Sequence, residues 1–164
     1  MPQTVVVLSE DVLAASDVAK ILALAGEDGA VYRVLVPTEV KHSVVSDFLD
    51  HLMVLDLKEA WEDVTGRNDL PDDVARRDAA EVLQGSVDAL EAAGAEVEAA
   101  TIADDVVVAL RAELAAAPDI LQVIAVTQPR AVEDTFHRGW ADKAEKELGV
   151  PVLHFYTGTS VVGE

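Results

Sequence analysis

Cysteine is absent from the 164-residue sequence. This absence excludes disulfide bonds, thiolate catalysis and zinc sites built on cysteine. Long apolar runs are also missing, since none approaches the roughly 20 residues that a membrane-spanning helix needs. The N-terminal residues MPQTVVVL lack the basic region and the cleavage site of a signal peptide. We therefore expect a cytoplasmic protein with no membrane partner.

Basic residues are scarce: 12 lysines and arginines stand against 31 acidic residues, which gives a formal net charge of -19. Such a field repels DNA, RNA and anionic lipid surfaces, so we expect no nucleic-acid partner. The acidic residues are interpreted as a solvated face that keeps the protein soluble. The alternative is an acidic face that receives a basic protein partner.

Apolar residues make up 51% of the chain, which suits a single α/β domain over residues 1–164 with a valine-rich sheet. The continuous apolar run at 4–8 predicts a central parallel strand that is covered on both faces. Residues 95–101 instead alternate apolar and acidic side chains, which is typical of a half-exposed strand near a sheet edge. The expected strands cover residues 4–8, 30–37, 95–101, 120–127 and 152–158.

Helical spacing of apolar residues fills the intervals between these strands. We expect Ser16 to cap the first helix, Asp72 or Asp73 to cap the second, and Asp104 or Asp105 to cap the third. A last helix is expected over about 138–148. Residues 41–70 interrupt the alternation and predict an inserted helical flap.

Five strands that alternate with helices predict a doubly wound five-stranded parallel sheet with helices on both faces. We expect the strand order 3-2-1-4-5, which opens a crevice at the carboxyl ends of strands 1 and 4, where the chain direction reverses. Ser9 and Thr127 are expected to face this crevice. Glu10 and Thr38, at the ends of strands 1 and 2, are further candidate ligand-binding residues.

This order of elements resembles the universal stress protein family over nearly the full length, apart from 41–70. The segment IADDVVVALRAELAAAPDILQVIAVT at 102–127 resembles the family's helix that leads into its fourth strand. The segment GWADKAEKELGVPVLHFY at 139–156 resembles its last helix and strand. The resemblance implies the fold of that family and of the related adenine nucleotide alpha hydrolases. The family includes members that bind nucleotides and members that bind none.

Nucleotide-binding members place Gly, two residues, Gly, nine residues, and then Gly with Ser or Thr directly after the fourth strand. Such glycines let a phosphate approach the backbone. The present chain has Thr127, two residues, Arg130, eight residues, and then Gly139 and Trp140. The family's ATP binders also have an aspartate at the end of strand 1, where this chain has Ser9. The resemblance therefore implies that ATP is not bound in the family manner, and we predict no cofactor.

Two arginines in the same loop leave an alternative open. Arg130 and Arg138 could bind a phosphate or a carboxylate through their side chains, and Trp140 could stack on a base, so that AMP or ATP is held differently. In the other interpretation both arginines pair with acidic neighbours and Trp140 packs in the core.

The last strand predicts a homodimer, because a long apolar edge exposes unpaired backbone groups that invite a partner. The resemblance implies pairing of this strand across a two-fold axis. The candidate dimer residues are Val152, Phe155, Val161 and Val162. The alternative is a covered edge in a monomer.

Motifs for catalysis are missing, since the sequence has no G-x-S-x-G, GxGxxG or P-loop pattern. We predict a non-enzymatic protein that acts through dimerisation and protein interaction. The alternative is a small-molecule module that binds an adenine nucleotide or another anionic ligand between strands 1 and 4. An enzyme on a related fold is a third class, for which the sequence supplies no nucleophile or metal set.

Overall fold

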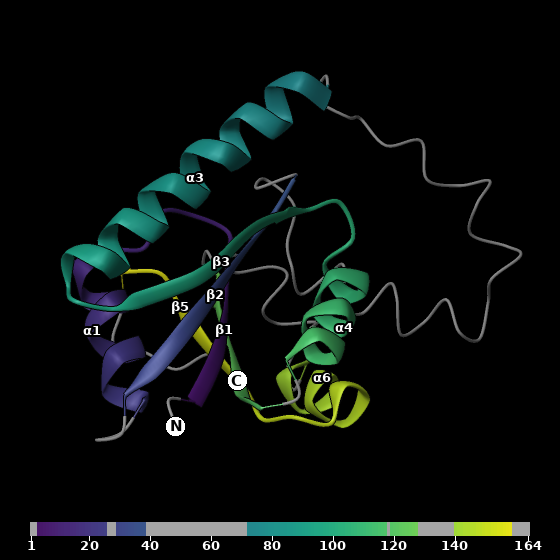
Figure 1. Ribbon diagram of the computed structural model, residues 1–164. Helices are drawn as coiled ribbons and strands as arrows, with labels where there is room; N and C mark the ends of the chain where they lie inside the picture. Colours follow the sequence, from purple (N-terminus) through teal and green to yellow (C-terminus); the bar gives the residue numbers. More distant parts are fainter. Residues whose placement is uncertain (1–2, 26–28, 39–71, 118, 128–139, 159–164) are drawn as a thin grey trace, which may run out of the picture.

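The computed structural model describes residues 3–25, 29–38, 72–117, 119–127 and 140–158 (Figure 1). The predicted insertion at 41–70 lies outside these ranges. The same holds for several predicted site residues: Arg130, Arg138, Gly139, Val161 and Val162. Predictions about these residues stay predictions.

The described strands form one five-stranded parallel sheet in the order β3-β2-β1-β4-β5, as predicted. The apolar run of the first strand occupies the centre, and the alternating segment lies at an edge. The strands are β1 (Gln3–Ser9), β2 (Ala30–Pro37), β3 (Glu96–Ala103), β4 (Ile120–Thr127) and β5 (Val152–Tyr156).

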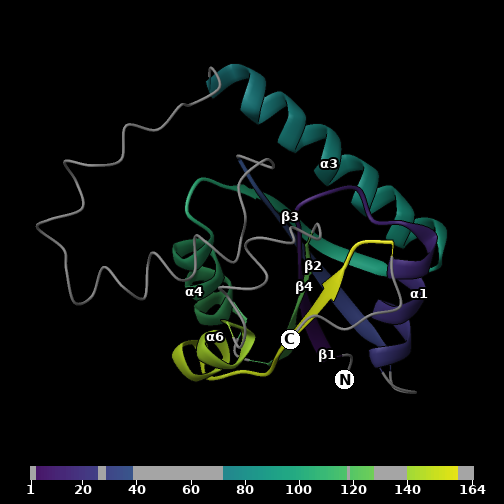
Figure 2. The same ribbon diagram turned by 180° about the vertical axis from the view of Figure 1, so that it is seen from behind.

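Helices cover both faces of the sheet, which confirms the doubly wound α/β fold. Figures 1 and 2 show α1 and α3 on one face and α4 and α6 on the other. None of the helices in the described ranges is long and apolar enough to cross a membrane. The helices are α1 (Ala15–Leu24), α3 (Asp72–Ala92), α4 (Val106–Ala116) and α6 (Trp140–Leu148).

The central strand divides its side chains between two apolar cores. Val5 and Val7 face α1 and α3, whereas Val6 and Leu8 face α4 and α6, and all four are at most 1% exposed. Burial on both faces is the reason that this segment shows no alternation of apolar and polar residues. Helix residues close both cores, with Ile21 of α1 on one face and Leu110 of α4 on the other.

The start of α1 differs from the prediction. Ser16 lies inside the first turn, and the N-cap position is held by Ala14. The carboxylate of Asp17 reaches back and accepts a hydrogen bond of 2.9 Å from the backbone N–H of Ala14. The carboxylate of Asp17 is therefore a hydrogen-bond acceptor at the start of the helix, where backbone N–H groups have no partner within the helix. In α4, by contrast, Asp105 caps as predicted and accepts from the N–H of Val108 at 3.0 Å.

Candidate functional site

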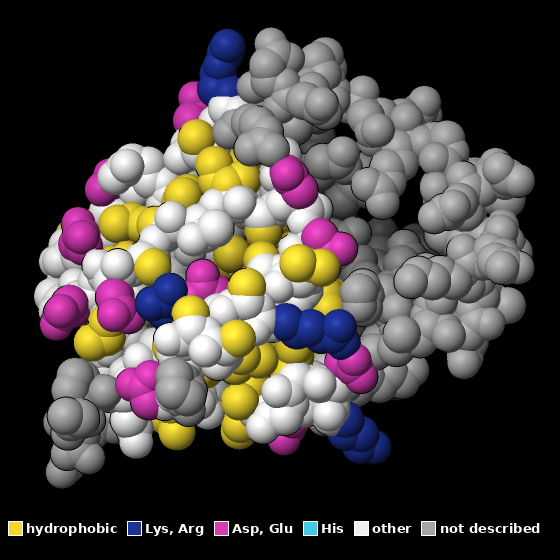
Figure 3. Space-filling view, turned by 45° about the vertical axis from the view of Figure 1, so that its right-hand side comes forward, with side chains coloured by type: hydrophobic (Ala, Val, Ile, Leu, Met, Phe, Trp, Pro, Cys, Tyr) yellow, Lys and Arg dark blue, Asp and Glu magenta, His cyan; other side chains and the backbone are white. Residues whose placement is uncertain are grey.

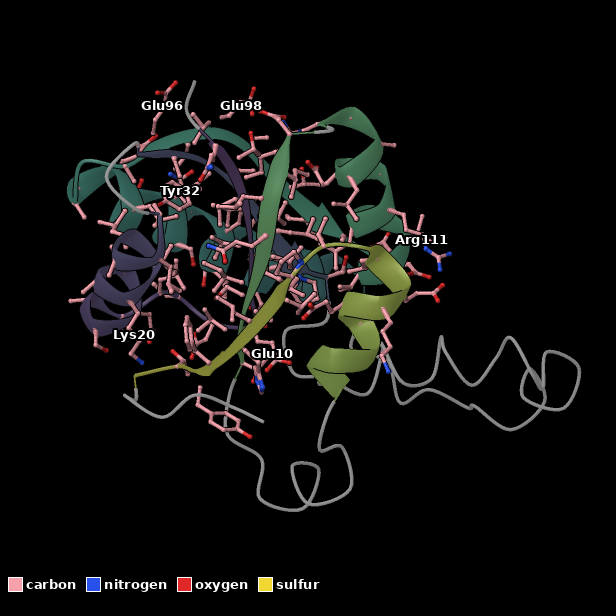
Figure 4. All side chains as sticks on the ribbon, turned by 90° about the horizontal axis from the view of Figure 1, so that it is seen from below. Glu10, Lys20, Tyr32, Glu96, Glu98 and Arg111 are labelled. Atoms are coloured by element: carbon pink, nitrogen blue, oxygen red, sulfur yellow. The ribbon has the colours of Figure 1, made fainter. Side chains whose placement is uncertain are left out.

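The predicted crevice corresponds to the carboxyl ends of β1 and β4, which are neighbours although their helices lie on opposite faces of the sheet. Ser9 pairs with Val126 across these strands, and the backbone N–H of Glu10 donates to the carbonyl of Val126 at 3.1 Å. Figure 4 shows Glu10 at this end of the sheet, near β5. Ser9, Glu10 and Thr127 are thus brought together, as the strand order requires.

Ser9 is fully buried, and its hydroxyl donates a hydrogen bond to the carbonyl of Asp11. The hydroxyl therefore holds the turn that follows β1. A side chain that is buried and already bonded to the protein gains less from a ligand, because ligand binding must first break the internal bond.

Thr127 is only 3% exposed, and its hydroxyl lies 2.5 Å from Nε2 of His154 on β5. His154 is itself buried, and its ring contacts Tyr156 edge-on with 4.9 Å between the ring centroids. No site role was predicted for His154. Its partner follows from the register in which Ala125 pairs with His154, because this places Thr127 on the same face two residues further along.

Glu10 is 1% exposed and adds an acidic side chain to the polar residues at the ends of β1 and β4. Glu10 also takes part in an interaction within the protein, so its carboxylate is not a free group that awaits a ligand.

Thr38 lies further along the same end of the sheet, beyond β2. Its hydroxyl donates to the carboxylate of Asp104 at 2.5 Å, and its N–H donates to the carbonyl of Ala103 at 2.8 Å. Thr38 is therefore tied to the end of β3. The structure places it beside the edge of the sheet and does not join it to Ser9 or Thr127.

The loop residues predicted to bind phosphate cannot be placed beside these groups. Arg130, Arg138 and Gly139 lie outside the described residues, and of Trp140 only the backbone at the start of α6 is described. In the described ranges, no group of three or more His, Asp or Glu side chains is arranged to hold a metal ion.

The two described residues of the predicted dimer surface are core residues of the single chain. Val152 and Phe155 are each 6% exposed and belong to the cores on opposite faces. Nζ of Lys20 on α1 lies 5.4 Å from the centroid of the Phe155 ring, and Figure 4 shows Lys20 on that side of the sheet. Pairing along β5 would therefore use its backbone edge, and the predicted dimer stays a prediction.

Asp17, for which no role was predicted, holds the chain that leaves β5. Its carboxylate accepts from the hydroxyl of Thr157 at 2.9 Å and from the N–H of Gly158 at 2.8 Å. These contacts join residues that are about 140 positions apart in the sequence, so no local sequence pattern predicts them. They fix the end of β5 against the first turn of α1.

A scan of the sequence against models of protein families finds no match, and a search of curated proteins finds no significant relative. Neither comparison identifies the universal stress protein family, so that resemblance stays a prediction.

Proposed function

We propose that this chain is a non-enzymatic protein of the universal stress protein type that acts through dimerisation and protein interaction. The observation that carries the proposal is that the polar side chains at the carboxyl ends of β1 and β4 are buried and already have partners within the chain. Ser9 and Thr127 are buried and hydrogen-bonded within the chain, and Glu10 adds a carboxylate beside them. This arrangement supports a crevice that does not hold ATP in the family manner.

A nucleotide titration tests the first half of the proposal. We expect no change in melting temperature with ATP, ADP or AMP in the presence of Mg²⁺, and no heat of binding in calorimetry. A ligand that binds only the native state at 100 times its Kd would raise the free energy of unfolding by about 2.7 kcal/mol. A saturable shift of that size would contradict the proposal.

The second candidate function is a small-molecule module, and it is favoured by the gathering of buried polar residues at the ends of three adjacent strands. In that function Arg130 and Arg138 supply the charge for an anionic ligand. A nucleotide-induced shift that disappears in Arg130→Ala would establish this candidate. Arg111→Ala is the matched control, because Arg111 lies on α4 and pairs with Glu147.

The second half of the proposal is tested by the molecular mass in solution. We expect a dimer by light scattering coupled to size-exclusion chromatography. Leu153→Lys places a charge on a half-buried position of the edge strand β5 and is expected to shift the protein towards monomer. Leu121→Lys on β4 is the control, since Leu121 is 38% exposed and does not lie on an edge strand. A monomeric unaltered protein would contradict the proposed dimer.

A further inference from the structure

The outer side of β3 is the longer of the two open edges of the sheet. β3 has eight residues and β5 has five, and no described strand pairs with the outer side of β3. Alternate N–H and C=O groups along such an edge have no partner strand. Several of its residues are exposed to solvent: Glu96, Glu98, Ala100 and Thr101. Among the described residues, this edge is therefore open to a further strand.

A bulge divides β3 into two parts with different properties. Tyr32 pairs with Val97 and the next residue of β2 pairs with Ala99, so Glu98 is the extra residue. Residues 96–98 thus combine charge with irregular pairing, which are both features that discourage strand addition. Residues 99–103 are regularly paired with β2 and carry only small or β-branched uncharged side chains. This second part lacks the features that protect an edge.

The charges beside the bulge are unbalanced. Arg33 on β2 donates to Glu98 at 3.0 Å and also to Glu113 on α4. One guanidinium is therefore shared by two carboxylates, and Glu96 adds a third in the same part of the edge. Figure 4 shows the side chains of Glu96 and Glu98 at the same margin of the molecule, both pointing away from the sheet. The excess of negative charge is complementary to a cationic side chain from outside.

The wider surface strengthens this preference. Acidic side chains are scattered over the described part of the face in Figure 3, and the whole chain has a net charge of -19. Such a field increases the rate at which a cationic segment arrives and lowers the rate for an anionic one. A second copy of β3 is disfavoured as the occupant, because a two-fold antiparallel pair centred on Thr101 would place Glu98 opposite Asp104 of the other copy.

We propose that the outer edge of β3 binds an extended basic peptide segment of a partner protein by strand addition. Residues 99–103 pair with a stretch of small or β-branched residues, and an adjacent lysine or arginine reaches Glu96 and Glu98. The regular part spans about 17 Å at roughly 3.3 Å per residue, which is enough for a short strand. The inference builds on the proposed function, because it names the kind of partner that a protein-interaction module would take.

The test uses a fluorescent peptide of alternating threonine and valine with lysines at both ends, titrated against the full chain by anisotropy. Saturable binding is expected, together with weaker binding at high salt. A peptide with glutamate in place of lysine is expected not to bind. Two further peptides carry N-methyl groups on alternate residues, one peptide on the odd-numbered residues and the other on the even-numbered residues. Only one of them should lose binding, because a strand presents alternate N–H groups to its neighbour.

Glu96→Gln is the matching change in the protein, and we expect it to weaken peptide binding about threefold to tenfold. Glu145→Gln removes the same charge from an exposed position on α6 and should leave the affinity unchanged. Equal binding of the acidic peptide, or no effect of either N-methylated phase, would overturn the inference. The oligomeric state is measured in the same titration. Dissociation of a dimer by the peptide would assign this edge to self-association, whereas binding by a monomer would contradict only the proposed dimer.

Discussion

Asp17, in the first turn of α1, accepts a hydrogen bond of 2.8 Å from the backbone N–H of Gly158, which follows β5. The same carboxylate binds the hydroxyl of Thr157 and the N–H of Ala14, and Asp17 is only 1% exposed. Gly158 has φ of +69°, a conformation that side chains other than glycine adopt at a cost. One buried side chain therefore holds both the start of a helix and the exit of an edge strand.

Replacement of this carboxylate tests its role. Asp17→Ala leaves three donors without their acceptor, and we expect the free energy of unfolding to fall by about 2 to 4 kcal/mol in urea denaturation. Ser16→Ala is the control, because Ser16 is exposed and does not cap the helix, and it should change stability by less than about 0.5 kcal/mol. A larger loss for Ser16→Ala than for Asp17→Ala would restore the sequence-based capping prediction.

The ion pair between Arg33 and Glu113 is more buried than the ion pair between Arg111 and Glu147. Arg33 and its partner Glu113 have side chains 19% and 14% exposed, whereas Arg111 and Glu147 are 46% and 29% exposed. The hydrogen bond with Glu113 raises the pKa of the Arg33 guanidinium above its usual value. Burial lowers this pKa, but its effect is smaller than that of the hydrogen bond. The arginine at this site therefore remains charged at every pH at which the fold is tested.

Arg33→Ala should destabilise the protein more than Arg111→Ala. We expect a loss of about 1 to 3 kcal/mol for Arg33→Ala, because Glu113 is left partly buried without its cation, and under about 1 kcal/mol for Arg111→Ala. Urea denaturation of both variants measures the difference. The double variant with Glu113→Ala should lose less than the sum of the single changes. Equal losses for the two arginines would show that burial does not distinguish these pairs.

The fold was predictable because its signals are local. The strand at 30–37 agrees with β2 at both ends, since a β-branched run is closed by Pro37, which has no N–H to donate. The central position of the first strand follows from its unbroken apolar run. The switch point between β1 and β4 then follows from topology, so Ser9 and Thr127 could be placed at one end of the sheet before any contact was known.

The contacts of the site were not predictable because they depend on register between distant strands. Thr127 meets His154 only because Ala125 is paired with that histidine. A shift of one residue would turn His154 to the other face. The same holds for the bulge at Glu98, since residues 95–101 alternate in sequence as a regular strand would, and the extra residue is visible only against β2.

Gly85 on α3 faces the loop that follows β1, and a Cβ at this position would lie 3.0 Å from both γ carbons of Val12. Glycine inside a helix ordinarily costs about 0.5 to 1 kcal/mol relative to alanine. We expect Gly85→Ala to gain little or to destabilise, since the loop must move. In a Val12→Ala background, which removes the contact at a side chain that is 43% exposed, the same change should stabilise. Thermal unfolding of the four proteins measures this coupling, and additive effects would contradict it.

Tyr32 is 1% exposed, and its hydroxyl has no hydrogen-bond partner in the described structure. Burial raises the pKa of Tyr32 above the usual value of 10.0. The stability linked to its neutral form is fully present below the pKa of the unfolded chain, and it is lost as pH rises through the folded pKa.

Tyr32→Phe should stabilise the protein by about 1 kcal/mol at neutral pH, because it removes the unpaired hydroxyl. It should also flatten the decline of stability above about pH 10 in urea denaturation. Tyr156→Phe, at a half-buried position, controls for general alkaline effects. A parallel decline in the original protein and in Tyr32→Phe would contradict the assignment.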